Sequence, residues 1–558
     1  MLAYCWKSTM VKYIFITGGV LSSVGKGVLT ASIGKMLQTR GYKATAIKID
    51  PYVNVDAGTM NPYIHGEVYV TDDGGEADLD LGTYERFLNL NLCKHNNITT
   101  GQVYQTVIEK ERKGDFLGKC VQIIPHITNE IKRRIRYVAK ESNWNIVLAE
   151  CGGTVGDIEG LPFLEAIRQM RLEEGYENTL YVHVALVPIL GVTGEMKTKP
   201  LQHSVNELRR IGIQPDTIVA RCEKMIDKDA TAKIALFGTI PENAVFCSHN
   251  AKSVYQVPTI LDQQGMGNYI CRRLQLEEHK PDWNSWTQFV DSVVNPKSEV
   301  KIALIGKYIG LVDSYVSMNE ALGHAGAACK TKVSIDYIQA ETLERDADAV
   351  KCLKNHDGIF VPYGFGPRGT EGKINAIRYA RENDVPFLGI CLGFQLAVVE
   401  FARNVCKLEN ANSTELNPET PNPVIDLMPE QKNVENKGAT MRLGAHKIMI
   451  TENTTASQLY RSETIFERHR HRWEVNPKYM DTLNKNGMRF SAKSEDLRRM
   501  EILELPDKYF FFASQFHGEF KSRPGKPDGE YYGFIKACLD KKQGKTKPLL
   551  EPKAEIAR

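Results

Sequence analysis

Short apolar runs alternate with amphipathic stretches along both halves of the chain. In the first half these runs are NIVLAE, TLYVHVALVP, DTIVA and AVFCS, and in the second half they are KIALIGKY, VSIDYI, GIFVPYG and PFLGI. Apolar runs separated by helical patterns are typical of parallel strands covered by helices. The sequence therefore predicts an α/β protein with two doubly wound domains and mainly parallel sheets.

The length of 558 residues is too great for a single hydrophobic core. Residues 279–300 contain two prolines, two tryptophans and no long periodic stretch, and an apolar strand restarts at Val300. We therefore place a linker at 279–299, between a first domain at 11–278 and a second domain at 300–541.

Three further segments are expected to lie outside the regular structure of these domains. Residues 1–10 are expected to form a disordered or lightly packed extension, and the Lys- and Pro-rich residues 542–558 a disordered tail. Residues 406–440 are rich in Asn, Glu and Pro, which predicts a long irregular connection of the kind that often carries function.

Composition excludes several classes of protein. A net charge of +3 without a large basic block argues against nucleic-acid binding, and the one basic cluster, RHRHR at 468–472, has no interleaved aromatic residues. No apolar run has the length of a membrane span, and glycines at 18 and 19 interrupt the run at 13–21, which we interpret as a strand. Twelve cysteines without a C-x-x-C pair indicate reduced thiols and a cytoplasmic location.

The segment PFLGICLGFQ at 386–395 predicts a nucleophile elbow. An apolar strand leads to Cys391, a helical pattern follows it, and Gly389 and Gly393 leave the backbone room for the sharp turn. A lone Cys after a strand is usually a small buried hydrophobic residue. The flanking glycines favour a catalytic thiol instead.

A thiol nucleophile needs a base, and the base needs an orienting acceptor. The segment FFASQFHGEF at 511–520 predicts a strand with His517 and Glu519 two positions apart, so that both would lie on one face. Cys391, His517 and Glu519 are therefore the predicted catalytic residues.

The first half of the chain contains a candidate phosphate loop. Residues 13–30 read YIFITGGVLSSVGKGVLT: an apolar strand, a turn rich in Gly and Ser, Lys26 and a helix start. Backbone N–H groups of such a turn, with a helix N-terminus, form an anion cradle. The strict G-x-x-x-x-G-K-[ST] pattern is not met, because five residues separate Gly19 from Gly25 and Gly27 follows the lysine.

Two carboxylates near this loop are candidate metal ligands. Glu150 follows the apolar run NIVLA, and Asp80 lies in the run DLDLG. Carboxylates at strand ends beside a phosphate loop are hard oxygen ligands suited to Mg²⁺. An acidic run is more often a solvated face, but each of these residues stands between an apolar stretch and a glycine.

Taken in order, these motifs resemble a known family. GICLGFQ with HGEF resembles the class I glutamine amidotransferase domain, whose pattern has Pro where this chain has Gly518. SSVGKG, KIDPYVNVDAGTM, HGEV, DLDLGTYERF, GGTVGDIE, GEMKTKP and ERHRHRWEVN resemble CTP synthase, and the resemblance extends from Tyr13 to about residue 540. It implies ATP-dependent amination of UTP to CTP with nitrogen from glutamine.

The resemblance also implies ligands and partners. It implies Mg²⁺, ATP as cosubstrate, GTP as allosteric activator, CTP as feedback inhibitor, and a homotetramer that can form filaments. In the first domain the implied binding positions cover the nucleotide, its phosphates, the metal at Asp80 and Glu150, and a CTP-sensing stretch. They are Ser22, Ser23, Val24, Gly25, Lys26, Gly27, Val28, Asp80, Asp157, Ile158, Glu159, Lys197, Thr198, Lys199, Pro200, Leu201, Gln202 and Lys233.

In the second domain the resemblance implies a glutamine site around the elbow, with the Leu392 N–H in the oxyanion hole. Its implied binding positions are Gly364, Leu392, Gly393, Phe394, Gln395, Glu415 and Arg472. Two further departures from the family pattern are visible. Leu201 stands where many relatives have Thr, and Tyr363 replaces a Gly of the P-G-G-F-G loop, which predicts strain in that loop and weaker glutaminase activity.

Two rival interpretations remain open. Cobyrinate-type amidases also join a P-loop domain to a triad glutaminase, but they activate carboxylates, and GGTVGDIE and KTKP count against them. The other rival is a filament-forming structural protein that has lost catalysis, which the intact Cys391, His517, Glu519 and Lys26 oppose.

Overall fold

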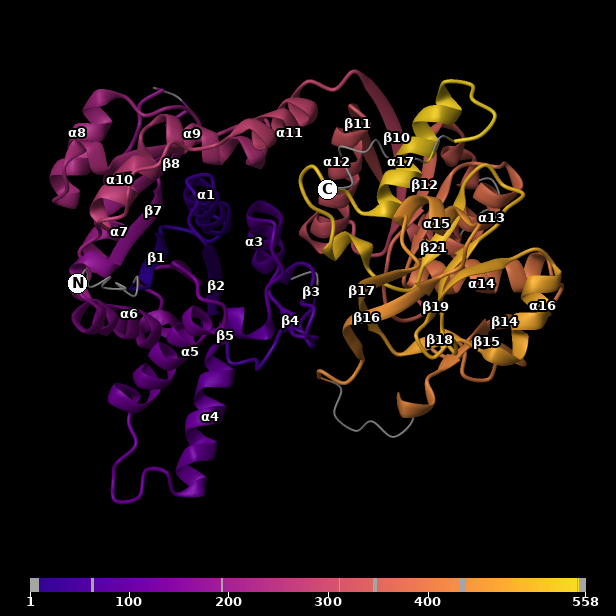
Figure 1. The fold of residues 1–558 in the computed structure, drawn as a ribbon, viewed down its shortest axis with the longest axis horizontal. Helices are drawn as coiled ribbons and strands as arrows, with labels where there is room; N and C mark the ends of the chain where they lie inside the picture. The colour runs from indigo at the N-terminus through magenta and orange to yellow at the C-terminus, as the bar shows by residue number, and fades with distance from the viewer. Residues whose placement is uncertain are drawn as a thin grey trace, which may run out of the picture. The chain divides into compact units, whose positions relative to one another are not determined.

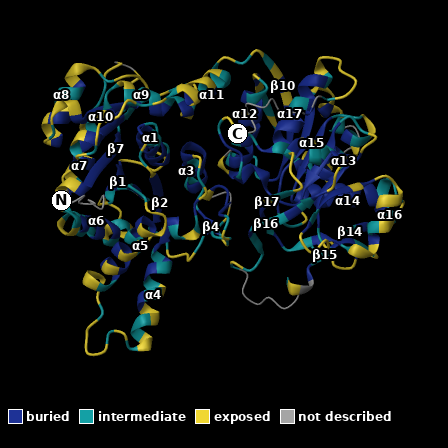
Figure 2. Ribbon diagram, in the orientation of Figure 1, coloured by how far each residue is buried: buried dark blue, intermediate teal, exposed yellow. Residues whose placement is uncertain are grey.

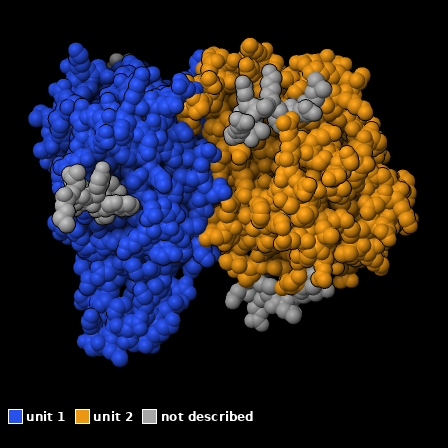
Figure 3. All heavy atoms as spheres, in the orientation of Figure 1, with its two compact units in different colours: residues 1–57, 80–284 blue, residues 58–79, 285–558 orange. Residues whose placement is uncertain are grey.

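The computed structural model describes residues 10–61, 65–191, 194–310, 312–344, 349–431, 438–548 and 550. The predicted extension at 1–10 lies almost wholly outside these residues, as does the last part of the predicted tail. The chain forms two compact units, shown in separate colours in Figure 3: unit 1 comprises residues 1–57 and 80–284, and unit 2 comprises residues 58–79 and 285–558.

Unit 1 is built on a seven-stranded sheet in the order β5-β2-β6-β1-β7-β8-β9 (Figure 1). All its neighbouring strands are parallel, as predicted. Its strands are β1 (Lys12–Gly19), β2 (Ala44–Asp50), β5 (Asn97–Thr99), β6 (Ile146–Cys151), β7 (Thr179–Leu186), β8 (Thr217–Cys222) and β9 (Val245–His249).

The helices of unit 1 lie between these strands along the chain, except for the last two, which follow β9. They are α1 (Lys26–Gln38), α3 (Asp80–Leu88), α4 (Thr100–Lys113), α5 (Thr128–Glu141), α6 (Leu161–Glu174), α7 (Lys199–Arg210), α8 (Lys228–Gly238), α9 (Val257–Gln263) and α10 (Met266–Arg273).

Unit 2 is built on a nine-stranded mixed sheet in the order β11-β10-β12-β13-β21-β20-β19-β16-β17. The first five strands are parallel, and the remaining pairs are antiparallel. The strands are β10 (Ser298–Gly306), β11 (Thr331–Gln339), β12 (Gly358–Val361), β13 (Phe387–Ile390), β16 (Arg442–Ile450), β17 (Thr464–His471), β19 (Arg489–Ser494), β20 (Met500–Glu504) and β21 (Phe511–Ser514).

The helices of unit 2 cover this sheet. They are α12 (Val316–Ala328), α13 (Thr370–Glu382), α14 (Leu392–Asn404), α15 (Thr455–Tyr460), α16 (Met480–Lys485) and α17 (Gly529–Lys542). In Figure 2 the central strands are almost entirely buried, whereas exposed residues concentrate on helices and loops. This pattern is the one that the apolar runs predict for sheets covered on both faces.

The predicted linker contains the division between the two units and also helix α11 (Asn284–Val294), whose Trp286 and Phe289 are buried. The prediction of an irregular connection at 406–440 is wrong. The predicted irregular connection contains β14 (Ala411–Ser413) and β15 (Asn422–Leu427), which form a small sheet with β18 (Trp473–Val475). Strands β14 and β15 are short and obtain their stability from tertiary packing, which local patterns do not reveal.

Residues 58–79 pack with unit 2, although the sequence pattern places them in the first domain. They carry the hairpin of β3 (Tyr69–Val70) and β4 (Glu76–Ala77). Glu67 accepts a hydrogen bond from the Ser317 backbone N–H at 3.0 Å, and Glu76 forms a 2.8 Å ion pair with Arg470. These partners are distant in sequence, so the packing of 58–79 against unit 2 was not visible in the motifs.

Candidate active site

Cys391 lies at a sharp turn between β13 and α14, as the elbow prediction requires. Its backbone has φ 54° and ψ −99°, a conformation that costs energy for a non-glycine residue and is found at functional sites. A Cβ at Gly393 would lie 2.1 Å from the Val361 carbonyl oxygen, so only glycine fits there. The Cys391 N–H donates to Ser514 O at 2.8 Å, which ties the turn to β21.

His517 and Glu519 lie together, but they do not lie on a strand. Strand β21 ends at Ser514, and residues 518–520 form a 3₁₀ turn, so the strand prediction is wrong at this point. The turn nevertheless brings His517 Nδ1 to 2.7 Å from Glu519 Oε1. Tyr531 donates to the other Glu519 oxygen at 3.1 Å, which fixes the carboxylate.

The electrostatics of this pair suit a base beside a thiol. Burial alone would lower the pKa of His517, but the charges of Glu519 and Cys391 raise it to about 10. The imidazole therefore holds its proton at neutral pH, as expected for a base paired with a nucleophilic thiolate. Gln515 also contacts the thiol, with its Nε2 at 3.7 Å from Cys391 Sγ.

The loop at 362–366 is held by two lysines whose side-chain nitrogens bind its carbonyl oxygens. Lys373 donates to Pro362 O at 2.7 Å and to Tyr363 O at 3.3 Å, and Lys307 donates to Phe365 O at 3.1 Å. In a trans peptide the C=O and N–H groups point in opposite directions. Fixing the Tyr363 carbonyl therefore also fixes the N–H of Gly364, which is a candidate oxyanion donor with the N–H of Leu392.

The other predicted glutamine-binding residues also lie in unit 2, and each of them has its own contacts. Glu415 accepts from the Gly366 N–H at 2.8 Å, and burial raises the pKa of its carboxyl group. Arg472 donates to Thr440 Oγ1 at 2.8 Å, and Gln395 donates to Trp473 O at 2.9 Å. The side chain of Phe394 belongs to the hydrophobic core, so it contributes packing and not a polar contact.

Tyr363 does not strain the loop. The described non-glycine residues with positive φ do not include it, so its backbone has no need of the conformational freedom of glycine. Tyr363 therefore shows none of the positive-φ strain that this departure could cause, and the predicted effect on glutaminase activity stays a prediction.

Gly518 stands beside two buried carboxyl groups. A Cβ at this position would lie 2.6 Å from Asp528 Oδ1 and 2.6 Å from Glu530 Oε1. Burial raises the pKa of Asp528 to about 6, and burial with the neighbouring Asp528 raises the pKa of Glu530 well above its ordinary value. The space beside Gly518 is thus filled by acids that resist ionisation.

Glu530→Gln is expected to stabilise the protein at pH 8. The folded-state pKa of Glu530 is raised, so its contribution to stability is complete below the unfolded-state pKa and is lost as pH rises through the folded-state pKa. Glutamine removes this loss, and we expect the free energy of unfolding to rise by about 1–3 kcal/mol at pH 8.

Urea unfolding at pH 8 and pH 4.5 measures this effect. The gain should shrink at the lower pH, where Glu530 is protonated in the folded state and about half protonated in the unfolded state. Glu463→Gln, at an exposed position of the same unit, serves as the control. Equal changes at both pH values, or no change at either, would contradict the expectation.

In unit 1 the predicted phosphate loop joins β1 to α1. Val20, Ser23 and Gly25 have φ of 78°, 56° and 95°, so the loop follows a constrained path. No side chain caps the N-terminus of α1 and its first turn holds no acidic residue, which suits an anion at the free N–H groups. Ser22 and Ser23 are exposed, whereas Val24 is buried and Val28 half-buried.

Lys26 is buried at the centre of this loop. Its Nζ donates to Gly153 O at 2.6 Å, and burial lowers its pKa while Glu150 opposes that effect. A Cβ at Gly18 would lie 2.7 Å from Lys26 Cδ, so the lysine packs directly over the end of β1.

Asp80 and Glu150 come together as predicted, through a lysine that the sequence reasoning missed. Lys48 Nζ donates to Asp80 and, at 3.1 Å, to Glu150 Oε1. A Cβ at Gly27 would lie 2.1 Å from Asp80 Oδ1, so this carboxylate occupies the space that a Ser or Thr would need after the lysine. Asp80 begins helix α3 and does not end a strand, which corrects that part of the prediction.

These two carboxylates fit the part of a Mg²⁺ site that protein usually supplies. Mg²⁺ at nucleotide sites takes one or two carboxylates and completes its shell with phosphates and water. Within the described residues, no group of three or more His, Cys, Asp or Glu side chains is arranged to hold a metal. The magnesium site therefore remains a proposal that depends on bound nucleotide.

The predicted triphosphate segment lies at the start of α7. Lys197 forms a 2.7 Å ion pair with Glu195, Lys199 lies over the Phe237 ring, and Gln202 donates to Thr198. Lys199 and Pro200 form the first turn of α7, and Lys233 lies on α8. Leu201 is buried in the core, so its side chain cannot serve as a phosphate contact.

The predicted CTP-sensing stretch is an exposed loop before α6. Asp157 Oδ2 accepts from the Thr154 N–H at 2.6 Å and thereby closes the loop. Ile158 and Glu159 are exposed, with Ile158 at 81%. Asp157 is exposed as well, but its carboxylate holds the loop closed, so Glu159 is the candidate acid for a contact with the nucleotide base.

Comparison with known proteins follows the same division of the chain. A family model described as CTP synthase N-terminus matches residues 12–276, and one for glutamine amidotransferase class-I matches residues 310–537. The CTP synthase of Pyrococcus abyssi is 58% identical over 537 residues, covering 96% of this chain and 99% of that protein. That of Caldanaerobacter subterraneus subsp. tengcongensis is 54% identical over 533 residues, with 96% and 99% covered.

Among solved structures, the glutaminase domain of Trypanosoma brucei CTPS with bound acivicin is 37% identical and covers 46% of this chain and 98% of that chain, with a TM-score of 0.42. The two matched regions together define a glutamine-dependent, ATP-driven ligase. With this identity to CTP synthases over nearly its whole length, the chain belongs to the CTP synthase family.

Proposed function

We propose that this protein converts UTP to CTP, using ATP and ammonia released from glutamine. The observation that carries the proposal is the pairing, on one chain, of the Cys391–His517–Glu519 site with the Lys26 phosphate loop. The His517–Glu519 pair beside Cys391 and the buried Lys26 in its loop support an enzyme over a purely structural filament protein.

The chemistry explains why both sites are needed. The 4-oxygen of uracil is a poor leaving group, so ATP first phosphorylates it, and ammonia then displaces phosphate. Cys391 attacks the side-chain amide of glutamine, His517 passes a proton to the departing ammonia, and water releases glutamate from the acyl-enzyme. Free ammonia is largely protonated at neutral pH, so a glutaminase on the same chain supplies it in nucleophilic form.

The residues of unit 1 have separate parts in this proposal. Lys26 and the α1 N-terminus bind the phosphates of ATP, and Lys197, Lys199 and Lys233 bind the triphosphate of UTP or CTP. Mg²⁺ bound by Asp80 and Glu150 would neutralise phosphate charge. Lys48 holds the two carboxylates in place.

We also propose the regulation and assembly that family membership implies. These are activation by GTP, inhibition by CTP, and a homotetramer that can form filaments. We propose a cytoplasmic location, supported by the described cysteines, all of which are free thiols. None of the described helices has the length and apolar character needed to cross a membrane.

An absorbance assay of the purified protein tests the proposed function. UTP should be converted to CTP with ATP, Mg²⁺ and glutamine, faster with GTP, and also with ammonium chloride in place of glutamine. A corrinoid acid offered as acceptor should remain unaminated. Amination of the corrinoid and not of UTP would assign the protein to the cobyrinate-type amidases.

Glu159→Ala is expected to weaken CTP inhibition much more than it raises the KM for UTP. The two nucleotides share a triphosphate but differ at ring position 4, where CTP has an amino donor, and an ionised Glu is an acceptor. The loss of one hydrogen bond to a charged group corresponds to roughly 1.5–3 kcal/mol, or about tenfold to a hundredfold in inhibition constant.

CTP inhibition curves of the variant and of Glu177→Ala, another exposed acid of unit 1, measure this effect. The control should match the wild type. An unchanged curve for Glu159→Ala, or equal losses for UTP and CTP, would refute the assignment.

A further inference from the structure

The imidazole of His517 is packed between two aromatic rings. On one side the Phe520 ring is stacked, with centroids 5.2 Å apart and planes 17° apart. On the other side the Tyr363 ring lies 5.6 Å away at 59°. Such contacts are favourable beyond the burial of area and restrict the plane of the ring between them.

Tyr363 is itself held at both ends. Its hydroxyl donates to Ser314 O, and Lys373 binds its carbonyl oxygen at 3.3 Å. Its ring also contacts Tyr315 at 5.6 Å, and the Tyr315 hydroxyl accepts the Lys307 N–H at 3.0 Å. These contacts fix the position of the Tyr363 ring independently of its contact with the imidazole.

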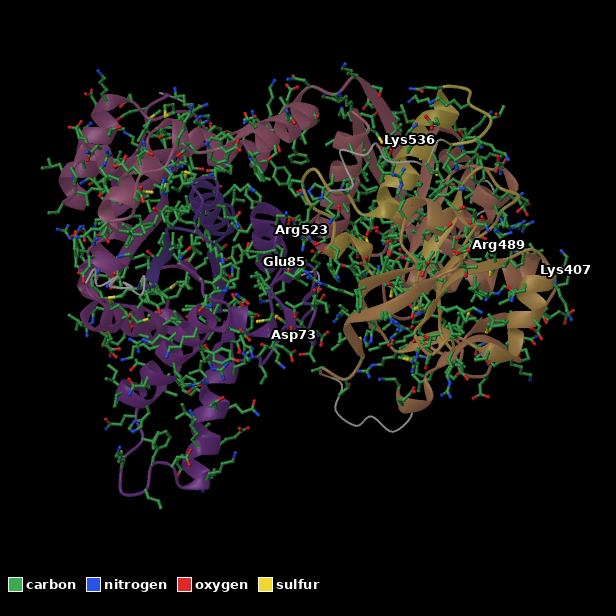
Figure 4. All side chains as sticks on the ribbon, viewed as in Figure 1. Asp73, Glu85, Lys407, Arg489, Arg523 and Lys536 are labelled. Carbon is green, nitrogen blue, oxygen red and sulfur yellow. The ribbon has the colours of Figure 1, made fainter. Side chains whose placement is uncertain are left out.

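Phe520 is fixed on the opposite side. The Tyr69 ring meets it edge-on at 4.9 Å, and the Tyr69 hydroxyl donates to Phe520 O at 3.0 Å. Arg523, labelled in Figure 4 beside this turn, donates to the same oxygen at 2.7 Å. The two aromatic rings that flank the imidazole, Tyr363 and Phe520, are therefore both held in place by other residues.

The cavity at this point is very small. It has a volume of about 20 Å³ and is lined by Cys391, His517, Tyr363, Phe520 and, from the attached segment, Val68. A space of this size holds about one water-sized molecule. Glycine at 363, the residue that the family pattern has, would leave the Tyr363 side of the imidazole open to water.

We propose that Tyr363 is a positioning residue for the catalytic base. Its anchored ring fixes the imidazole of His517 in the plane that directs Nε2 to the Cys391 thiol, while Glu519 holds Nδ1. The proposal rests on the proposed glutaminase function and adds to it a residue in which this chain departs from the family pattern. Small displacements of a reacting group can cost about a hundredfold in rate.

Two variants and a control test this role. Tyr363→Ala removes the ring, Tyr363→Phe keeps the ring and removes the hydroxyl anchor, and Tyr379→Ala removes a half-buried Tyr on α13. For each, kcat and KM for glutamine hydrolysis are measured. The rate of Cys391 alkylation by iodoacetamide is followed from pH 5 to 9 by mass spectrometry, and ammonia-dependent CTP formation reports on unit 1.

We expect Tyr363→Ala to lower kcat by about tenfold to a hundredfold with little change in KM. Its alkylation profile should shift, because the thiol–imidazole pair is no longer held together. Tyr363→Phe should lose less, and Tyr379→Ala should match the wild type. Unchanged kcat and an unchanged alkylation profile in Tyr363→Ala, or a KM effect without a kcat effect, would overturn the proposal.

The alkylation profile separates this inference from the proposed function. If the wild type made no CTP from glutamine, the proposed function would fail, yet a profile that depends on Tyr363 would still support its positioning role. A parallel loss of ammonia-dependent activity would indicate general damage to the fold and would refute a role confined to the base.

Discussion

Cys391→Ala is expected to abolish glutamine-dependent CTP formation and to leave ammonia-dependent formation largely intact. In the proposed mechanism the thiol is the attacking atom, and the His517–Glu519 pair cannot replace it. The loss should be on the order of a thousandfold or more, as for other members of catalytic triads. Lys26 and the carboxylates that bind Lys48 belong to a different compact unit, so the substitution leaves them unchanged.

Parallel assays with glutamine and with ammonium chloride measure this separation. Cys406→Ala, which removes a half-buried thiol from the same unit, is the matched control and should keep both activities. Loss of both activities in a folded Cys391→Ala protein would contradict the division of labour between the units.

The parts of the fold that were predictable are those in which local pattern and tertiary structure agree. Buried parallel strands are largely apolar, so β6, β7, β10 and β13 were visible as runs. The elbow was predictable because the sharp turn at Cys391 leaves no room for side chains at the neighbouring glycines, which is a local steric requirement. Such features need no knowledge of distant contacts.

The features that were missed depend on contacts between distant residues. Lys48 is buried between Asp80 and Glu150, and the three residues are far apart in sequence. The segment at 58–79 joins unit 2 through Glu67 and Glu76. A lysine at the end of an apolar strand, in KIDPY, was the available signal, because a charged residue is rarely buried without a partner.

The predicted pairing of His517 with Glu519 is present, but the strand predicted to carry both residues is wrong. Alternation along a strand would put both side chains on one face, but the structure uses a tight turn in which Phe520 N–H donates to His517 O at 3.3 Å. Two routes thus lead to the same pairing at a separation of two residues. Spacing alone does not distinguish them.

Lys26→Ala is expected to abolish both the glutamine-dependent and the ammonia-dependent activity. In the proposed mechanism, phosphorylation of UTP precedes attack by ammonia from either source, so the loss of the phosphate-binding cation should affect both activities. A cation at the transferred phosphate can supply several kcal/mol of transition-state stabilisation, which corresponds to a loss on the order of a thousandfold.

The structure explains why no neighbour replaces Lys26. Lys48 is already bound to Asp80 and Glu150, and the free N–H groups of α1 carry only partial charge. Both activities should be measured for Lys26→Ala and for Lys113→Ala, an exposed lysine on α4 of the same unit. Glutamine hydrolysis without UTP amination should persist in Lys26→Ala, because unit 2 keeps its own site. Near-normal turnover with ammonia would mean that the lysine serves only to pack against Gly18 and Gly153.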